Sequence, residues 1–285
     1  MTDRMRVAVV GAGTMGNGIA HTFAQHEYDV LLIDVADTQL ERARQMIAGN
    51  LDRQVKKGSI DAGQRDATLG RLTMTTSRDD AAGAGFIIEA VPENAALKAE
   101  ILRTLESAAG DAILASNTSS ISITELAANV QRPDRFIGMH FMNPVPVMQL
   151  VEVIRGLQTS DETMSTVLDM TRVLGKTPVE VNDFAGFVSN RVLMPMINEA
   201  MFCLMEGVAE AEAIDEVMKL GMNHPMGPLA LADLIGLDTC LSILEVLQRD
   251  IGDDKYRPCP LLRKYVAAGW LGRKTGRGFY SYEKS

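Results

Sequence analysis

His140 is the histidine best placed to do chemistry among the four in this 285-residue sequence. It ends the apolar segment 136–140, which predicts a strand, and ligands of open parallel sheets bind beyond the carboxyl ends of strands. Glu152 lies inside the next apolar segment, 150–154, where burial of an unpaired carboxylate is costly. These residues predict a pair in which Glu152 fixes the tautomer of His140, and the imidazole acts as a general base. A purely structural ion pair is the alternative.

Two further polar residues are candidates for contacts to a substrate. Ser119 follows the predicted strand 113–116, in a run of hydroxyl residues, some of which must cap the next helix. It lacks the glycine-flanked setting of a nucleophilic serine, so we expect its hydroxyl to orient a substrate or cofactor oxygen. Asn190 lies where the helical part of the chain begins, and its amide can donate to a substrate carbonyl. Capping or a role in the core is the alternative for Asn190.

A glycine-rich segment predicts a dinucleotide site. The apolar run 7–10 is followed by Gly11-Ala12-Gly13-Thr14-Met15-Gly16 and then by a helical segment, 17–24. In this context Gly11 allows a tight turn, Gly13 lets the backbone approach a pyrophosphate, and Gly16 lets the helix pack closely.

Asp34 closes the following predicted strand, 30–34. A carboxylate at this position accepts hydrogen bonds from the ribose hydroxyls of adenosine and repels a 2′-phosphate, so NAD is favoured over NADP. An ordinary solvated residue at a strand end is the alternative.

Basic residues at 53, 56 and 57 form a small patch in an acidic chain of net charge −9. The patch is a candidate site for phosphates away from the dinucleotide, although a solvated helix face would have the same pattern. The other histidines, His21, His26 and His224, show no constellation that suggests a metal site or acid–base chemistry.

The pattern of elements predicts an α/β fold, with a Rossmann-like, mostly parallel sheet, followed by an all-helical C-terminal domain. The boundary between the domains 1–183 and 184–285 is placed where strand signals stop. The segment 39–70 contains two helical patterns that break near residues 58–59, and it predicts an inserted helical hairpin. Strands are expected at 6–10, 30–34, 72–75, 86–89, 113–116, 136–140, 150–154 and 179–181, and helices at 188–207, 211–220, 229–248 and 261–268.

Composition narrows the class of protein. A content of 46% hydrophobic and 23% charged residues is that of a globular protein, and the negative charge disfavours a nucleic-acid partner. Neither the start of the chain nor any apolar run predicts a signal peptide or a membrane span, so we expect a cytoplasmic protein. Cys203, Cys240 and Cys259 have no spacing that suggests a disulfide framework or a metal site.

Several longer motifs carry a resemblance to a known family. They are GAGTMG at 11–16, ASNTSSISI at 115–123, RFIGMHFMNPVPVMQLVEVI at 135–154, DFAGFVSNR at 183–191, NHPMGPLALADLIGLDT at 223–239 and GRKTGRGFY at 272–280. Together they resemble the 3-hydroxyacyl-CoA dehydrogenase family over nearly the whole chain, with the bacterial 3-hydroxybutyryl-CoA members closest.

The resemblance implies an NAD-dependent oxidoreductase acting on acyl-CoA, in which the helical domain binds substrate and forms a homodimer. It implies that His140 is the catalytic base or acid, Glu152 its partner and Ser119 a contact to the substrate 3-oxygen. Asn190 would be an active-site amide, and Lys56 would lie near coenzyme A. The expected cofactor contacts are Gly11, Gly13, Thr14, Met15, Gly16, Asp34, Glu93, Lys98, Asn117, Ser119, Asn143 and Lys274.

The chain departs from the family pattern at two positions, with Met142 in place of a common Phe and Ala185 in place of a common Pro. Neither departure touches the expected chemistry, although Met142 can alter the shape of the acyl pocket. Two alternatives stay open: a related dehydrogenase for a sugar acid or other 3-hydroxy acid without coenzyme A, and a dinucleotide-binding sensor or structural protein that has lost turnover.

Overall fold

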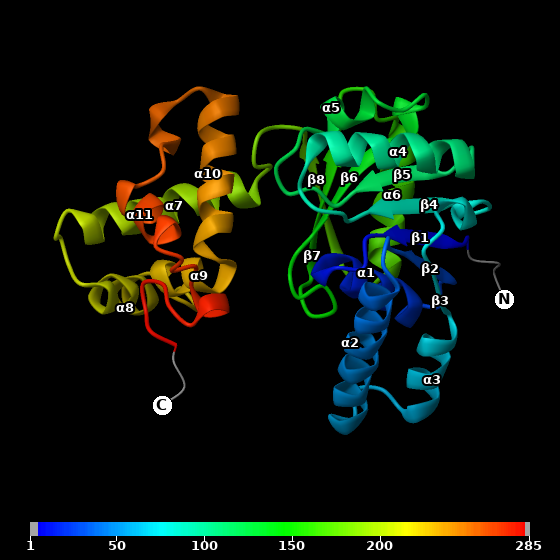
Figure 1. Ribbon diagram of the computed structural model, residues 1–285, viewed down its shortest axis with the longest axis horizontal. Coiled ribbons are helices and arrows are strands. Elements are labelled where there is room, and N and C mark those ends of the chain that lie inside the picture. Colours follow the sequence, from blue (N-terminus) through cyan, green and yellow to red (C-terminus); the bar gives the residue numbers. More distant parts are fainter. Residues whose placement is uncertain (1–4, 283–285) are drawn as a thin grey trace. The chain divides into compact units, whose positions relative to one another are not determined.

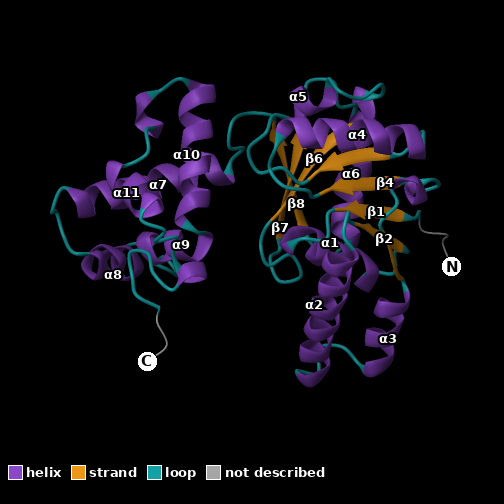
Figure 2. Cartoon of the chain, in the orientation of Figure 1, coloured by secondary structure: helices purple, strands orange, loops and turns teal. Residues whose placement is uncertain are grey.

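The computed structural model of the chain describes residues 5–282, which form two compact units that divide between Phe184 and Ala185. Strands and helices alternate in the first unit, whereas the second contains helices (Figures 1 and 2). The elements of the first unit are β1 (Val7–Val10), α1 (Thr14–Gln25), β2 (Val30–Ile33), α2 (Asp37–Lys56), α3 (Ala62–Gly70), β3 (Leu72–Thr75), η1 (Arg78–Ala81), β4 (Phe86–Glu89), α4 (Ala95–Ala109), β5 (Ile113–Ser116), α5 (Ile123–Ala127), η2 (Pro133–Arg135), β6 (Phe136–Phe141), β7 (Leu150–Arg155), α6 (Asp161–Val173) and β8 (Thr177–Asn182).

The first unit is built on one eight-stranded sheet with the order β3-β2-β1-β4-β5-β6-β7-β8. Strands β1 to β6 are parallel, β7 is antiparallel to β6, and β8 is parallel to β7. The order reverses between β1 and β4, and in open α/β sheets ligands bind beyond the carboxyl ends of the strands at such a point. The predicted α/β fold class with a mostly parallel sheet is therefore confirmed.

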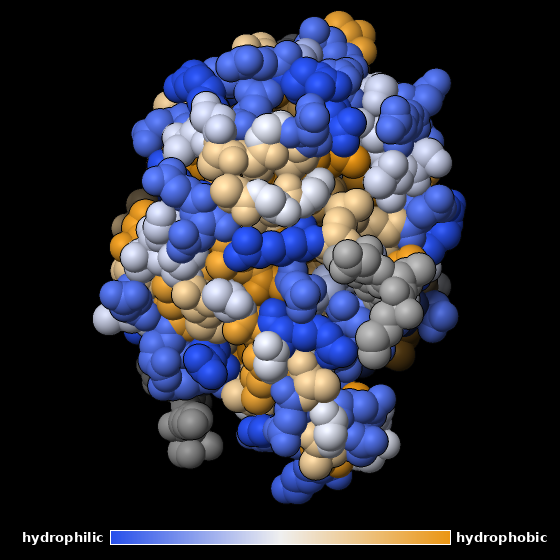
Figure 3. Space-filling view, turned by 90° about the vertical axis from the view of Figure 1, so that its right-hand side faces the viewer, coloured by the Kyte–Doolittle hydropathy of each residue, from blue (hydrophilic) through white to orange (hydrophobic). Residues whose placement is uncertain are grey.

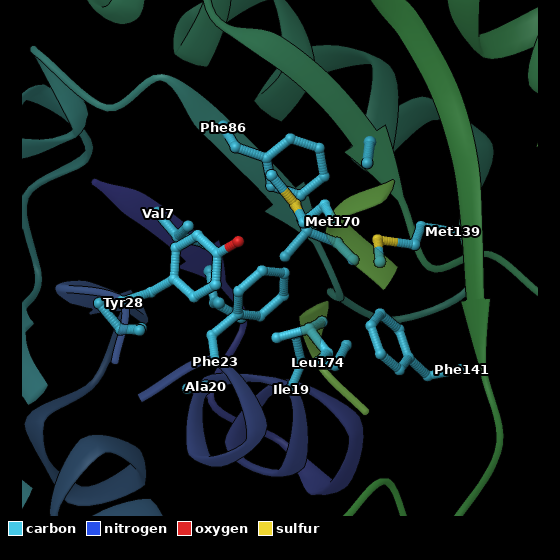
Figure 4. Close-up of a cluster of buried hydrophobic side chains, with 14 of the residues drawn as sticks. Val7, Ile19, Ala20, Phe23, Tyr28, Phe86, Met139, Phe141, Met170 and Leu174 are labelled. Atoms are coloured by element: carbon cyan, nitrogen blue, oxygen red, sulfur yellow. The ribbon is translucent and has the colours of Figure 1, made fainter. Parts of the chain in front are cut away.

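The central strands are continuous apolar runs because helices cover both faces of the sheet. Every residue of β1, β2 and β4 is buried. Phe23 of α1 packs edge-on against Tyr28, with ring centroids 5.3 Å apart, and lies 6.1 Å from the ring of Phe86 on β4 (Figure 4). This packing fixes α1, the helix that follows the glycine-rich segment, against the sheet.

The predicted helical hairpin is present as α2 and α3, which extend together away from the sheet (Figure 1). Only one side of α2 is buried, at Leu40, Ala43, Ile47 and Leu51. Asp61 caps α3 by accepting a hydrogen bond from the backbone of Gln64, whose side chain accepts one from the backbone N–H of Asp61. The lowest part of the face drawn in Figure 3, at the end of this hairpin, is mostly hydrophilic.

The second unit is helical, as predicted, and packs around its own apolar core. The segment 229–248, expected to be helical throughout, is broken into two helices at Gly236, whose φ of +104° is unfavourable for other residues. Its elements are α7 (Ser189–Met205), α8 (Ala211–Gly221), α9 (Pro228–Ile235), α10 (Leu237–Ile251), η3 (Asp254–Tyr256), α11 (Pro260–Ala267) and η4 (Arg273–Thr275).

A buried carboxylate explains one of the C-terminal motifs. Asp233 of α9 is 1% exposed and accepts hydrogen bonds from the backbone N–H groups of Phe279 and Tyr280 and from the hydroxyl of Tyr282. A Cβ atom at Gly278 would lie 1.9 Å from a carboxylate oxygen of Asp233, so only glycine fits there. The motif thus ties the end of the described chain to α9.

Two classes of feature are absent from the part of the chain that the structure describes. Among residues 5–282, no helix is both long enough and apolar enough to cross a membrane. Within the same residues, no three His, Cys, Asp or Glu side chains are grouped so that they could hold a metal ion.

Candidate active site

The glycine-rich segment forms one wall of a pocket of about 630 Å³ at the carboxyl ends of β1, β2 and β4. Gly11 has a φ of +101°, and a Cβ atom there would lie 2.6 Å from the carbonyl oxygen of Ala90. A Cβ atom at Gly16 would lie 1.6 Å from the carbonyl oxygen of Gly11, so larger residues would push α1 off the sheet. Gly13 is exposed, a Cβ atom there would have nothing within 4 Å, and its backbone is open to a ligand.

The start of α1 is suited to a phosphate. Its N-cap residue is Gly13, which provides no side-chain hydrogen bond to the free N–H groups of the first turn. Thr14 and Met15 line the pocket beside this end of the helix. Helix N-termini bind phosphates through such N–H groups and through the helix dipole, so the residues present fit the pyrophosphate of a dinucleotide.

Asp34 lies in the same pocket, directly after β2. One of its carboxylate oxygens accepts a hydrogen bond from the N–H of Ala12 at 2.7 Å, and the other accepts one from the N–H of Ala36 at 3.3 Å. The side chain therefore supports the glycine turn and carries a negative charge into the pocket. Both properties fit the end of the dinucleotide that carries the adenosine ribose.

His140 and Glu152 are brought together by the antiparallel pairing of β6 and β7. They are directly opposite each other in the register, and paired residues in a sheet project to the same face. Nδ1 of His140 lies 2.8 Å from Oε2 of Glu152, and the two residues are 8% and 1% exposed. Because a carboxylate only accepts, Nδ1 carries the proton and Nε2 is the nitrogen suited to exchange a proton with a ligand.

Ser119 lies in the loop that follows β5, and Glu93 organises that loop. Oε1 of Glu93 accepts hydrogen bonds from the backbone N–H groups of Ser119 at 2.9 Å and Ser120 at 3.0 Å. It also accepts from the hydroxyl of Thr118 at 2.6 Å and, more weakly, from that of Ser119 at 3.3 Å. Burial alone would raise the pKa of Glu93, but the charge of Lys98 and these hydrogen bonds outweigh it, so the pKa is lowered.

Lys98, expected to contact the cofactor, is buried on α4 with 1% exposure. Its ammonium donates to Oε1 of Glu89 at 2.8 Å and to the carbonyl of Val91 at 3.2 Å, and it lies 3.3 Å from Oε2 of Glu93. These partners match the three donors of an ammonium group. Lys98 is thus linked to the loop that carries Ser119 through Glu93, and its expected contact with the cofactor stays a prediction.

The loop after β6 carries Asn143, which is exposed and precedes a cis proline. Asn117, at the end of β5, accepts a hydrogen bond from the N–H of Phe141 at 2.9 Å and so holds the end of β6 beside His140. Lys176 donates to the carbonyls of Val145 at 2.6 Å and Met148 at 2.8 Å, and burial lowers its pKa. The functional assignment of Asn117 and Asn143 stays a prediction.

Three further candidate residues come from other parts of the chain. Lys56 is the exposed last residue of α2, at the far end of the hairpin. Asn190 is on α7 of the second unit and is 9% exposed. Lys274, also in the second unit, forms an ion pair with Asp238 at 2.5 Å. Their roles, and the formation of a homodimer through the second unit, stay predictions.

Sequence reasoning missed Glu89 and Lys176. Glu89 ends the buried strand β4, where a carboxylate after three apolar residues gives the same signal that pointed to Glu152. That signal was available in the sequence. Lys176 follows α6 in an ordinary turn, and its burial depends on how the loop after β6 folds over it, for which the sequence carries no sign.

Comparisons with known proteins agree over both units. Residues 6–184 match the family described as 3-hydroxyacyl-CoA dehydrogenase, NAD binding domain, and residues 186–282 match its C-terminal domain. A protein of Bacillus subtilis named probable 3-hydroxybutyryl-CoA dehydrogenase is 58% identical over 280 residues, which cover 98% of both chains. The crystal structure of (S)-3-hydroxybutyryl-CoA dehydrogenase from Ralstonia eutropha has a TM-score of 0.95 and 53% identity, and the match covers 99% of this chain and 100% of that one.

A more distant structure carries a different activity in its name. A diketoreductase that acts on dicarbonyl compounds has a TM-score of 0.86 and 30% identity, with the match covering 99% of this chain and 100% of that one. Proteins with this architecture are thus named for more than one kind of carbonyl substrate, so the fold alone does not identify the substrate.

Proposed function

Because this chain belongs to the 3-hydroxyacyl-CoA dehydrogenase family and is an NAD-dependent enzyme, we propose that it interconverts (S)-3-hydroxybutyryl-CoA and acetoacetyl-CoA. The observation that carries the proposed chemistry is the hydrogen bond of 2.8 Å between His140 and Glu152. It joins a proton-transfer group and a buried carboxylate in the unit that holds the dinucleotide pocket.

His140 acts as the general base in the oxidation of the alcohol. Nε2 takes the proton of the 3-hydroxyl group while C3 gives up its hydrogen as hydride, and the 3-oxo product forms. NAD, when bound, supplies the hydride acceptor. In the reduction of acetoacetyl-CoA the same nitrogen returns a proton to the 3-oxygen, so His140 then acts as the general acid.

Glu152 stabilises the imidazolium that forms when His140 takes up the proton. With 1% exposure, Glu152 faces little competing solvent, and the interaction between the two charges is stronger than it would be in water. Its carboxylate also holds the ring so that Nε2 keeps one direction. Ser119, whose loop is held by Glu93, orients the 3-oxygen toward this nitrogen.

The coenzyme A thioester is favoured over a free 3-hydroxy acid by the degree of similarity. The two proteins named for 3-hydroxybutyryl-CoA share 58% and 53% identity with this chain, against 30% for the diketoreductase. A dinucleotide-binding protein without turnover is disfavoured because Ser119, His140, Glu152 and Asn190 are all present, and a protein that only binds the dinucleotide does not need this set.

The proposal is tested with purified protein, NADH and two matched substrates, acetoacetyl-CoA and free acetoacetate. We expect kcat/KM to be at least about a hundredfold higher for the thioester, because binding energy from the remote coenzyme A moiety lowers the barrier at C3. Equal values would favour a dehydrogenase for free acids, and no turnover with either substrate would reject the proposed activity.

His140→Gln tests the mechanism in the same assay. We expect kcat to fall by roughly a hundredfold to ten-thousandfold, the usual loss when a general acid or base is removed. His224→Gln in the second unit is the control, and its turnover should match that of the unaltered protein. A His140→Gln variant with nearly normal kcat would remove the imidazole from the proposed reaction.

A further inference from the structure

Glu89, at the end of β4, is a buried carboxylate with no assigned role. It is 0% exposed, and both of its oxygens are occupied. Oε1 accepts hydrogen bonds from the N–H of Val91 at 2.6 Å and the ammonium of Lys98 at 2.8 Å, and Oε2 accepts one from the hydroxyl of Ser116 at 2.7 Å. A carboxylate buried to this extent is costly unless such partners compensate for it.

One arm of this network runs directly to the loop after β5. The hydroxyl of Ser116 donates to Glu89 and accepts a hydrogen bond from the N–H of Thr118 at 3.2 Å. The hydroxyl of Thr118, which is fully buried, accepts in turn from the N–H of Ile121 at 2.9 Å. Glu89 therefore fixes the first residues of the loop that carries Ser119.

A second arm reaches the same loop through two charged side chains. Lys98 is bound to Glu89 on one side and lies 3.3 Å from Glu93 on the other. Glu93 then accepts hydrogen bonds from the backbone N–H groups of Ser119 and Ser120. The order of charges is negative, positive, negative, so the ammonium holds the two carboxylates together and transmits a displacement of one to the other.

The third contact of Glu89 is to the loop that carries Glu93 itself. The N–H of Val91 donates to Glu89, while Ala90, Val91 and Pro92 line the dinucleotide pocket. One carboxylate thus holds the loop on the cofactor side and, through two arms, the loop on the substrate side.

From this geometry we propose that Glu89 is a positioning residue for the reaction, setting the Ser119 loop relative to the dinucleotide pocket. The inference rests on the proposed function only for the identity of the reaction. Glu89 touches neither substrate nor cofactor in this scheme, and it acts through Ser116, Lys98 and Glu93.

Glutamine is the informative replacement because it keeps the shape and removes the charge. Its single oxygen can still accept from Val91 and Lys98, but without a charge it holds the ammonium less strongly, and Glu93 is then the remaining charged partner of Lys98. Its amide nitrogen would face Ser116, whose hydroxyl proton would then lose the acceptor that it has in Glu89. In Glu89→Gln we expect kcat with acetoacetyl-CoA to fall about ten- to hundredfold through misplacement of the loop.

A double-mutant cycle separates positioning from general destabilisation. If Glu89 acts through the Ser119 loop, Glu89→Gln adds little to the loss already caused by Ser119→Ala, because the two changes remove one shared contribution. If the loss of kcat in the double variant equals the product of the losses in the two single variants, the proposal is wrong. Glu106→Gln is the matched control, since Glu106 on α4 also accepts hydrogen bonds from backbone N–H groups, those of residues 131 and 132, outside the network.

Hydrogen exchange of the backbone amides gives a readout independent of turnover. In Glu89→Gln the amides of Ser119 and Ser120 should exchange at least about tenfold faster, while those of β6 keep their protection. Unchanged exchange at these amides would overturn the proposal even if the enzyme is active. Lack of turnover in the unaltered protein would reject the proposed function and leave this measurement interpretable.

Ser116→Ala covers the outcome in which Glu89→Gln fails to fold. This variant removes the hydrogen bonds of the Ser116 hydroxyl to Glu89 and Thr118 and keeps all the charges, so we expect a smaller loss of kcat, about threefold to tenfold. In the double variant with Ser119→Ala, the two losses of kcat should again be smaller than their product. A Ser116→Ala variant with normal kcat and normal exchange at Ser119 would overturn the positioning role of this arm.

Discussion

Asp34 combines two tasks that a substitution can separate. Its carboxylate accepts a hydrogen bond from the N–H of Ala12, which supports the glycine turn, and it carries a negative charge into the dinucleotide pocket. Asn keeps an oxygen for Ala12, removes the charge and loses only the longer hydrogen bond from the N–H of Ala36 at 3.3 Å. We therefore expect the preference of Asp34→Asn for NADH over NADPH to fall by roughly tenfold or more, because repulsion of the 2′-phosphate is lost.

The measurement is the ratio of kcat/KM with NADH to kcat/KM with NADPH. The Kd of each nucleotide, obtained from the change in protein fluorescence as the nucleotide is added, provides a second measure of the preference. Asp37→Asn is the control, since this carboxylate is exposed at the start of α2 and does not line the pocket. An Asp34→Asn variant that keeps the original preference would show that selectivity comes from another residue.

At the scale of residues, the sequence predicts pairs of interacting side chains but not networks of three or more. The contact between His140 and Glu152 follows from a charge inside an apolar strand and a histidine on the strand before it, both of which are visible in the sequence. The burial of Lys98 depends on how α4 packs over β4, which no spacing within the chain determines. For that reason the sequence does not reveal that the ammonium of Lys98 lies between two carboxylates, and the cofactor contact that the resemblance implies for Lys98 stays a prediction.

Helices α1 and α2 meet at a histidine that has no catalytic task. His21 on α1 is fully buried, and within residues 5–282 its Nδ1 has no hydrogen-bond partner, while its Nε2 lies 3.5 Å from Nε2 of Gln54 on α2. Burial is the main cause that lowers the pKa of His21 from 6.5 to about 4, against a smaller opposing effect of the Gln25 side chain. The packed helices therefore hold the neutral ring.

This helix contact should make the fold sensitive to acid. Since the pKa of His21 is lower in the folded chain, protons bind preferentially to the unfolded chain below pH 6.5, and stability falls progressively toward pH 4. Between pH 7 and pH 5 the free energy of unfolding should fall by about 2 kcal/mol more in the unaltered protein than in His21→Gln. Urea unfolding at both pH values measures the difference.

His26→Gln provides the control for the acid effect, because His26 is only half-buried at the end of the same helix. This variant should retain the acid dependence of the unaltered protein. If His21→Gln loses as much stability on acidification as the parent, the buried imidazole is not the group responsible.

At the scale of elements, the sequence pattern predicts the positions of the strands more completely than the ends of the helices. Runs such as VAVV and VLLI have both faces covered, so they are apolar throughout and stand out from their surroundings. The helix expected over 229–248 continues an apolar spacing across Gly236, but the backbone there adopts a positive φ and two helices result. The spacing of apolar residues indicates which face of a helix is buried, but it does not indicate where the backbone changes direction.

For the whole molecule, the net charge of −9 opposes the binding of an anionic substrate. The basic residues Arg53, Lys56 and Lys57 at the end of α2 are a local exception. We predict that Lys56→Ala raises KM for acetoacetyl-CoA several-fold, about threefold to tenfold, with little change in kcat, because a contact with the coenzyme A phosphates is lost equally in ground and transition states. Steady-state kinetics at low ionic strength measures the effect.

A truncated thioester provides the control for this electrostatic argument. Acetoacetyl-pantetheine lacks the nucleotide phosphates of coenzyme A, so its KM should be the same for Lys56→Ala and the unaltered protein. Added salt should raise KM for acetoacetyl-CoA more in the unaltered protein than in the variant, since exposed charges are screened within about 10 Å at 0.1 M salt. If Lys56→Ala raises KM equally for both thioesters, the basic end of α2 does not recognise the phosphates, and the attraction that offsets the negative charge of the molecule arises elsewhere.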